Sequence, residues 1–187
     1  MRADAVRNRA KIVEAARAAF GERGLATQME DVARSAGVGV GTVYRHFPTK
    51  DLLVRALIVD KMERLAARAK EALDDPQADP WEAFSSVLWH GAQTQLKDRA
   101  LAQVLASMPQ GTWREAAEEE TQLGDRMAAL LRRAQQAGVV RPDVRPDDIP
   151  LVMCGLGAVV QNGRSWERYM QLVLDGFRAT GPERLAD

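Results

Sequence analysis

Residues 27–47 constrain the fold more than any other stretch, because a glycine separates two short helical patterns there. Residues 29–36, with the sequence MEDVARSA, are typical of a short helix that Gly37 ends. Residues 38–47 form a further short helical element, which Pro48 closes. Helix, glycine-containing turn, helix is the unit that places its second helix in the major groove of DNA. Many helix pairs with no DNA function share this pattern, so the pattern alone leaves both interpretations open.

Polar residues mark the points at which helices of this region begin. Thr27 and Glu30 have the spacing of a reciprocal capping box, which predicts that Thr27 is the N-cap of the second helix. Thr49 suits the N-cap of a long helix that runs to about residue 73, and Asp51 lies favourably in the first turn of that helix.

The rest of the chain is also patterned as helices, and no convincing run of alternating strand residues interrupts them. We therefore predict an all-α fold of about nine helices, with a three-helix domain over residues 1–50 and a larger helical domain over residues 51–187. The remaining helices are expected over residues 6–20, 81–97, 98–107, 112–136, 147–162 and 165–179.

Charge is distributed unevenly, although the formal net charge is zero. Residues 1–50 carry nine Lys and Arg against five Asp and Glu, whereas residues 51–187 carry 17 against 21. This asymmetry is either ordinary scatter or the sign of an anionic partner for the first segment. The single cysteine, Cys154, excludes an internal disulfide. Because the amino terminus lacks a secretory signal and the apolar run at residues 151–160 is too short to span a bilayer, we expect a soluble cytoplasmic protein with no membrane partner.

The usual signatures of an enzyme are missing from the sequence. Its two histidines, His46 and His90, are far apart, and it has no cysteine pair, metal-ligand cluster, phosphate-binding glycine loop or nucleophile elbow. The carboxylate pairs at residues 74–75 and 147–148 lie in proline-rich turns. We therefore expect no catalysis, no cofactor and no metal. An architectural DNA-binding protein that ignores ligands is a third class, but a large acidic second domain would add little to its affinity for DNA.

The segment AGVGVGTVYRHFPTKDLL closely resembles the signature of the TetR-type (tetracycline-repressor-like) regulators. The matching positions are Ala36, Gly37, Val38, Thr42, Val43, Tyr44, His46, Phe47, Lys50 and Leu52. The resemblance covers about residues 8–55. It implies a helix-turn-helix DNA-binding domain followed by a ligand-binding and dimerisation domain. It also implies a transcriptional regulator, by default a repressor, which binds a palindromic operator as a homodimer and is released by a small apolar or amphipathic effector.

Several residues of this segment suit contact with DNA. Hydroxyl, imidazole and ammonium groups suit phosphate oxygens, which accept most protein–DNA hydrogen bonds; these groups belong to Thr42, Tyr44, His46 and Lys50, and Thr27 lies at a similar helix start. The resemblance places Val40, Gly41, Thr42, Tyr44 and Arg45 nearest the base edges. Arg45 suits a guanine or a phosphate equally. We expect Val43 and Phe47 to point inward and hold the short helix on the first one.

The basic amino terminus has two interpretations. It carries Arg2, Arg7, Arg9 and Lys11, which either reach phosphates or a minor groove or form a solvated helix start.

The second domain has an expected dimer face and an expected pocket, both implied by the resemblance. The dimer face would be built from the last two helices, and its candidate residues are Gly155, Val159, Trp166, Met170, Val173, Leu174 and Phe177. The candidate pocket residues are Phe84, Leu88, Trp89, Gln93, Met108, Trp113, Met127 and Met153, with His90 as a second polar anchor. Residues at these helical spacings also suit an ordinary intramolecular core, so the sequence leaves that alternative open for both sets.

Overall fold

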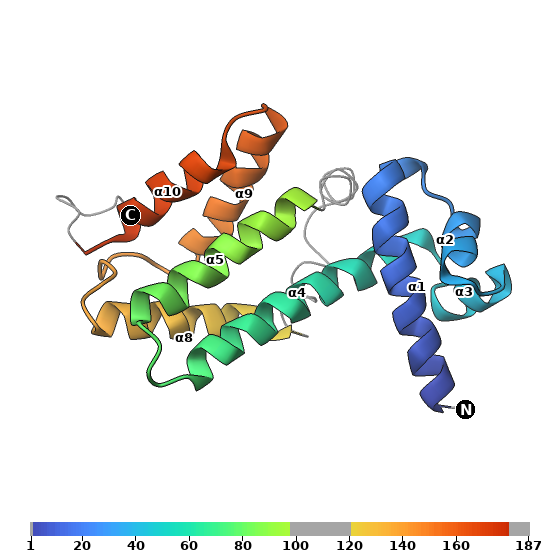
Figure 1. Cartoon of the computed structure of the whole chain (residues 1–187), viewed down its shortest axis with the longest axis horizontal. Coiled ribbons are helices and arrows are strands. Elements are labelled where there is room, and N and C mark those ends of the chain that lie inside the picture. The colour runs from blue at the N-terminus through green and yellow to red at the C-terminus, as the bar shows by residue number, and fades with distance from the viewer. Residues whose placement is uncertain (1, 98–120, 180–187) are drawn as a thin grey trace. The chain divides into compact units, whose positions relative to one another are not determined.

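The computed structural model describes residues 2–97 and 121–179, and these residues are organised almost entirely as helices (Figure 1). The α-helices are α1 (Arg2–Arg23), α2 (Met29–Ala36), α3 (Val40–His46), α4 (Lys50–Asp74), α5 (Pro80–Lys97), α8 (Leu123–Gln136), α9 (Asp148–Gln161) and α10 (Trp166–Phe177), with a 3₁₀ turn, η1, at Gly24–Ala26. The all-α prediction is confirmed. The helix expected over residues 98–107 and the start of the one expected over 112–136 lie outside the described residues.

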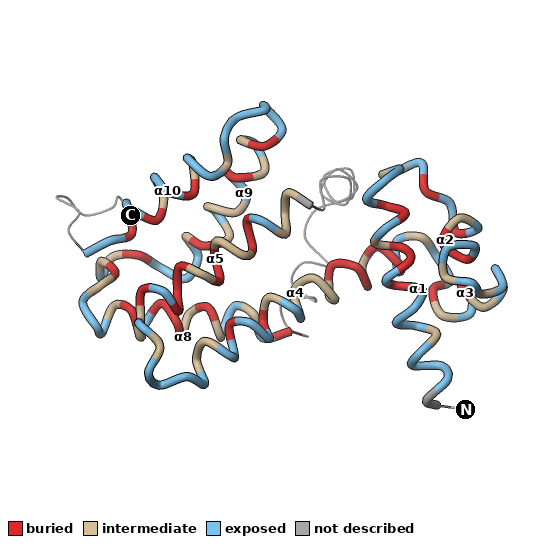
Figure 2. Tube along the Cα trace, in the orientation of Figure 1, coloured by how far each residue is buried: buried red, intermediate tan, exposed pale blue. Residues whose placement is uncertain are grey.

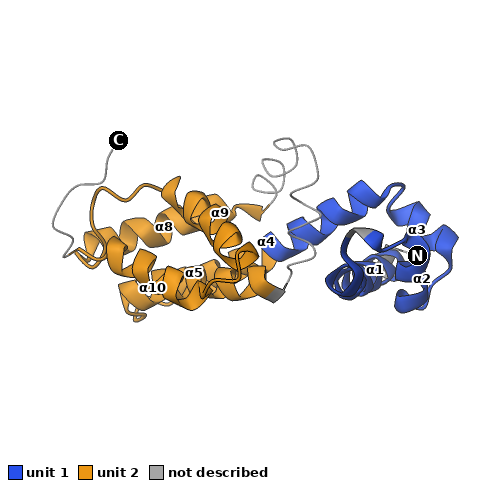
Figure 3. Cartoon of the chain, turned by 90° about the horizontal axis from the view of Figure 1, so that it is seen from above, with its two compact units in different colours: residues 1–62, 97–120 blue, residues 63–96, 121–187 orange. Residues whose placement is uncertain are grey.

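The chain divides into two compact units (Figure 3). Among the described residues, the first unit holds residues 2–62 and the second holds residues 63–96 and 121–179. The division lies within α4, after Met62, whereas the boundary expected from the sequence lies at the start of that helix. One continuous helix therefore contributes its first half to one unit and its second half to the other.

The first unit is held together by an apolar core between α1, α2, α3 and the first half of α4 (Figure 2). Ile12, Ala16, Val43 and Leu53 are fully buried in it, and Phe47 is 3% exposed. Val43 and Phe47 therefore point inward, as expected from the sequence. Because α3 has only seven residues, this packing rather than its own hydrogen bonds must stabilise it.

The second unit has its own core, formed by the second half of α4 with α5, α8, α9 and α10. The rings of Phe84 in α5 and Phe177 in α10 lie 6.3 Å apart at its centre. After α10 the chain pairs with the connector that follows α8, through an isolated bridge between Val140 and Arg178. The guanidinium of Arg178 lies 3.8 Å from the ring centroid of Trp81, so the end of α10 is held against the start of α5.

Polar bonds from α8 hold the turn between α4 and α5. The guanidinium of Arg133 donates to the backbone carbonyls of Ala72, Asp75 and Ala78, at 3.2, 2.9 and 2.8 Å. Ala72 lies in the last turn of α4, where carbonyls lack a partner within the helix, and Asp75 and Ala78 lie in the turn that follows. One side chain therefore satisfies three backbone acceptors that lie more than fifty residues away in the sequence.

A close approach joins α9 to α10. A Cβ on Gly155 would overlap the hydroxyl oxygen of Tyr169, and that hydroxyl donates to the carbonyl of Val152 at 3.1 Å. Burial and the neighbouring Cys154 raise the pKa of the Tyr169 hydroxyl above its ordinary value. Only glycine leaves room for this contact.

Within the described part of the chain, no helix combines the length and hydropathy that crossing a membrane requires.

Candidate nucleic-acid interface

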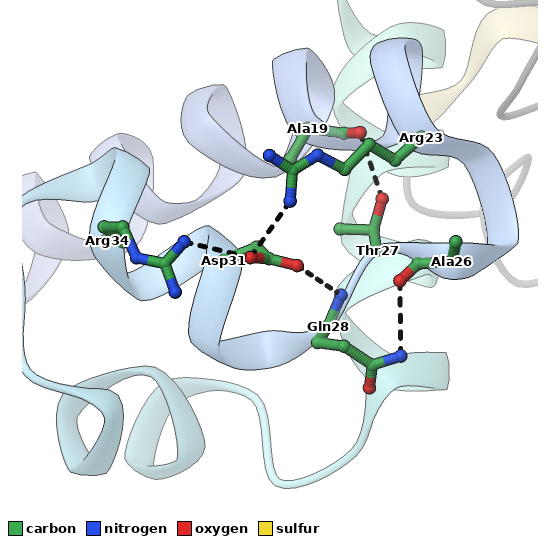
Figure 4. A network of polar contacts seen from close by, with 7 residues as sticks. All are labelled: Ala19, Arg23, Ala26, Thr27, Gln28, Asp31 and Arg34. Atoms are coloured by element: carbon green, nitrogen blue, oxygen red, sulfur yellow. Dashed lines mark hydrogen bonds and ion pairs between the residues drawn. The ribbon is translucent and has the colours of Figure 1, made fainter.

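The start of α2 differs from the expectation by one residue (Figure 4). The N-cap is Gln28, whose N–H donates to the carboxylate of Asp31 at 3.2 Å. The predicted capping box of Thr27 and Glu30 is therefore wrong, and the box consists of Gln28 and Asp31. Thr27 is fully buried, and its hydroxyl donates to the carbonyl of Ala19 at 3.0 Å. A side chain engaged in this way has no surface to offer to DNA.

Asp31 also fastens α2 to α1. Its carboxylate lies 3.1 Å from the guanidinium of Arg23, in the last turn of α1, and 3.3 Å from that of Arg34, one turn further along α2 (Figure 4). The Gln28 N–H, followed by the positive charge of Arg23, lowers the pKa of this carboxyl below its ordinary value. The first two helices are therefore joined by a cap and an ion pair that share one carboxylate, while Glu30 is left on the exposed surface.

The turn between α2 and α3 requires a left-handed residue. Gly37 has φ +66°, and its N–H bonds to the carbonyls of Ala33 and Arg34 at the end of α2. Glycine takes this conformation without steric cost. Gly39, which follows shortly after, is the N-cap of α3. The sequence prediction of a helix, a glycine turn and a second helix is confirmed here.

One face of α3 is free of the core. Val40, Gly41, Tyr44 and Arg45 are exposed, whereas Val43 is buried. Val40 is 38% exposed and Tyr44 is 43% exposed. Thr42 and His46 are half-buried at the edges of this face. The helix therefore presents methyl, phenol and guanidinium groups together, a set that suits base edges and phosphates.

Two cations of this unit each lie on an aromatic ring of the first core. Lys50, at the start of α4, has its ammonium nitrogen 5.5 Å from the ring centroid of Phe20. Thr49 caps the same helix by accepting from the N–H of Leu52 at 3.2 Å, as the sequence predicts. Arg9, from α1, has its guanidinium carbon 5.4 Å from the ring centroid of Phe47.

Sequence reasoning left the position of Arg9 undecided, although a signal for it exists. Arg9 precedes the buried residues Ile12 and Val13 by three and four positions, so it lies on the same side of α1 as they do. A long side chain at such a position covers apolar surface with its stem and brings its charge to the edge.

A cavity of about 300 Å³ opens in the second unit between α4, α5 and α10. Most of the residues that line it are of polar types, and the lining consists of Arg68, Glu82, Ser85, Ser86, Trp89, His90, Gln93 and Leu174. Of the predicted pocket residues, Trp89, His90 and Gln93 line it. The structure buries Phe84, Leu88 and Met127 in the core instead, and Met153 packs against Gly91. Met108 and Trp113 lie outside the described residues. In the described ranges, no cluster of three or more side chains suits a metal ion.

The family is decided by two matches that together cover most of the chain. Residues 12–57 match the family described as bacterial regulatory proteins, tetR family, and residues 79–179 match the domain described as transcriptional regulator SbtR-like, C-terminal domain. The chain belongs to the TetR family. This TetR-family member is accordingly a helix-turn-helix transcriptional regulator, and its family is one of regulators and not of enzymes.

Relatives of this TetR-family chain support the assignment. The HTH-type transcriptional repressor KstR2 of Mycobacterium tuberculosis is 32% identical over 148 residues, which are 74% of this chain and 72% of the relative. The HTH-type transcriptional regulator UidR of Escherichia coli K12 is 30% identical over 149 residues, 77% of this chain and 74% of the relative. The crystal structure of a TetR regulatory protein from Mycobacterium vanbaalenii matches with a TM-score of 0.70 at 35% identity, over 95% of this chain and 98% of that one.

The expected dimer residues of this TetR-family chain fall into two groups. Met170, Leu174 and Phe177 are at most 8% exposed, so they belong to the core of their own subunit and have little surface left for a partner. The others are half-buried: Gly155, Val159, Trp166 and Val173. Sequence reasoning missed two leucines on the same two helices, Leu151 and Leu172, which are 70% and 63% exposed.

Proposed function

We propose that this TetR-family regulator is a cytoplasmic repressor that binds a palindromic operator as a homodimer and leaves it when a small amphipathic effector occupies the second unit. The observation that carries the DNA half of the proposal is the exposed face of α3. Its residues Val40, Gly41, Tyr44 and Arg45 are held outward by a core that buries Val43 completely. A single unit of this kind reads one half-site, so a palindrome needs two copies.

The dimer half of the proposal is supported by an uncovered stripe on α9. Leu151, Cys154 and Ala158 follow one another at helical spacing and are all exposed. Leu172 adds a second exposed leucine from α10, which packs beside α9. Large apolar side chains exposed on neighbouring helices are typical of a surface that another chain covers.

The effector half is supported by the cavity lined by Trp89 and by polar residues of α4 and α5. Its volume of about 300 Å³ is at the small end of ligand sites. An indole beside Arg68, Glu82 and His90 suits a ligand with both a flat apolar part and a polar group, so the lining favours an amphipathic effector over an apolar one. RolR, a protein of the same fold at 21% identity, has been crystallised with the ligand resorcinol.

Selection of binding sites from random duplexes tests DNA binding and dimerisation together. We expect the purified chain to enrich an inverted repeat and to bind it with two chains per duplex, or a multiple of two. Enrichment of a direct or single half-site, or a stoichiometry of one, would contradict the proposal.

A screen of small amphipathic compounds by thermal unfolding tests the proposed effector site. Compounds that raise the melting temperature should also weaken binding to the selected duplex. Ser86→Trp, which fills the cavity, should abolish both effects, while Gln171→Trp on exposed α10 should leave them unchanged. If Ser86→Trp responds to the compounds as the wild type does, the effector site lies elsewhere.

A further inference from the structure

The amino-terminal turns of α1 cover no core. Figure 1 shows them extending past α2 and α3, and Figure 2 shows them mostly exposed. Within residues 4–11 only Asn8 is even half-buried. Arg7 in these turns pairs with Asp4, whereas no hydrogen bond or ion pair joins Arg9 to another described residue. A helix that continues for two turns beyond the surface it packs against needs another reason for its length.

The fold places the guanidinium of Arg9 at the end of α3. This group lies over the ring of Phe47, which is the C-cap of α3. The last turn of α3 already carries Arg45 and His46, and the His46 ring lies 6.4 Å from the same phenylalanine. Three cationic or titratable groups from two helices therefore surround the carboxyl end of α3, where the helix dipole also favours positive charge over negative.

We propose that Arg9 is a DNA contact of this regulator, which binds a backbone phosphate beside the groove that α3 enters. In helix-turn-helix units the first residues of the reading helix contact base edges, so its carboxyl end leads out toward the sugar-phosphate strand. A guanidinium there meets phosphate oxygens, which it can bind through two parallel N–H groups. The contact of its guanidinium with the ring of Phe47 restrains the Arg9 side chain, so less conformational entropy is lost on binding than for a freely moving side chain.

The alternative is that Arg9 only covers Phe47. The two roles are separated by Arg9→Met, because methionine keeps an unbranched stem over the ring and removes the charge. Arg9→Lys keeps the charge and loses the planar fork. A matched control is Arg132→Met, which removes the same charge from an exposed position on α8 in the second unit.

The experiment is a fluorescence-anisotropy titration of a labelled duplex of random sequence with each full-length variant, repeated over a series of salt concentrations. Random sequence is sufficient because phosphate contacts do not depend on sequence. For Arg9→Met we expect binding about tenfold weaker for each subunit engaged. The slope of log K against log salt should become shallower by about 0.9 for each subunit. Arg9→Lys should keep most of the slope, and Arg132→Met should match the wild type.

Thermal unfolding of each variant shows whether the fold is intact. If Arg9→Met melts well below the wild type, Arg9→Gln takes its place in the same titration. An affinity and a salt slope equal to those of the wild type in the charge-free variant would overturn the proposal. A wild-type chain that binds no duplex at all would overturn DNA binding itself as well, so the two failures are distinguishable.

Discussion

The hydroxyl of Tyr169 occupies the space in which a side chain on Gly155 would begin. It donates from there to the carbonyl of Val152, so the same atom joins α10 to α9 and must move if position 155 carries any side chain. The pair makes the approach of these two helices sensitive to a single methyl group.

Gly155→Ala should therefore destabilise the chain by about 1–3 kcal/mol, because the rigid tyrosine ring must move. Tyr169→Phe removes the obstructing oxygen and one hydrogen bond, at a cost of about 1 kcal/mol. In the double variant we expect the loss of unfolding free energy to be smaller, by at least about 1 kcal/mol, than the sum of the losses in the two single variants. Denaturant unfolding of the four proteins measures this coupling. Gly176→Ala on α10, where an added Cβ meets nothing, is the control and should be neutral or stabilising.

The carboxylate of Asp31 should make the first unit sensitive to acid. Its pKa is lowered in the folded chain by the Gln28 N–H and by Arg23, so its contribution to stability is fully present above the pKa of an unfolded aspartate, about 3.9. That contribution is lost as the pH falls through the lower pKa of the folded state.

Asp31→Asn keeps an acceptor for the Gln28 N–H and removes the charge that faces Arg23 and Arg34. We expect it to be less stable than the wild type in urea at neutral pH, with the difference shrinking in acid. Asp175→Asn, at an exposed position of α10, should show no such pH dependence. A difference between Asp31→Asn and the wild type that stays constant from neutral to acidic pH would show that the ion pairs are not its cause.

Arg133 should be needed for the turn between α4 and α5. Arg133→Ala leaves three backbone carbonyls without this donor and should lower the free energy of unfolding by about 2 kcal/mol. Arg133→Lys should recover little of the lost unfolding free energy, since an ammonium group cannot direct hydrogen bonds to three carbonyls as the planar guanidinium does. The neighbouring Arg132→Ala, at an exposed position, is the comparison in thermal unfolding and should behave as the wild type. Equal melting temperatures for the two alanine variants would rule out this role.

Tyr44 and Lys50 remain predicted DNA contacts, and their positions make them suitable for substitution. Tyr44 is 43% exposed on α3, so Tyr44→Ala should fold normally and bind all duplexes more weakly. Lys50→Ala should in addition make the salt dependence shallower by about 0.9 for each subunit. Lys70→Ala, later on the same helix and paired with Asp74, is the charge-matched control. Gel-shift titrations in which both variants bind as tightly as the wild type would contradict the assignment.

The order and type of the helices could be predicted because each depends on local signals. Apolar periodicity places α1, α4 and α5, and Gly37 ends α2 in the expected way. The capping box was misplaced because Thr27 with Glu30 and Gln28 with Asp31 have the same spacing. The choice between them depends on the carbonyl of Ala19, which takes the hydroxyl of Thr27, and no local pattern reveals that contact.

The cavity was harder to predict than the reading helix for a similar reason. Methionines and aromatics of the second unit were expected to line it, but most of those described are the core. Trp89, His90 and Gln93 of its lining were expected, whereas Ser85 and Ser86 of α5 look like an ordinary solvated surface in the sequence. Contacts between segments far apart in the chain, such as those of Arg133, produce no periodic sequence pattern from which they could be predicted.

The helix shared by the two units determines where this regulator can be recombined with others. Leu53, Val54 and Leu57 lie in the first half of α4 and are buried in the core of the first unit. A hybrid gene joined at residue 50 would replace these side chains and leave the donor's reading helix without the surface on which it is held. A junction after Met62 carries the complete core across, so exchange of operator specificity between relatives should tolerate that crossover point and not the earlier one.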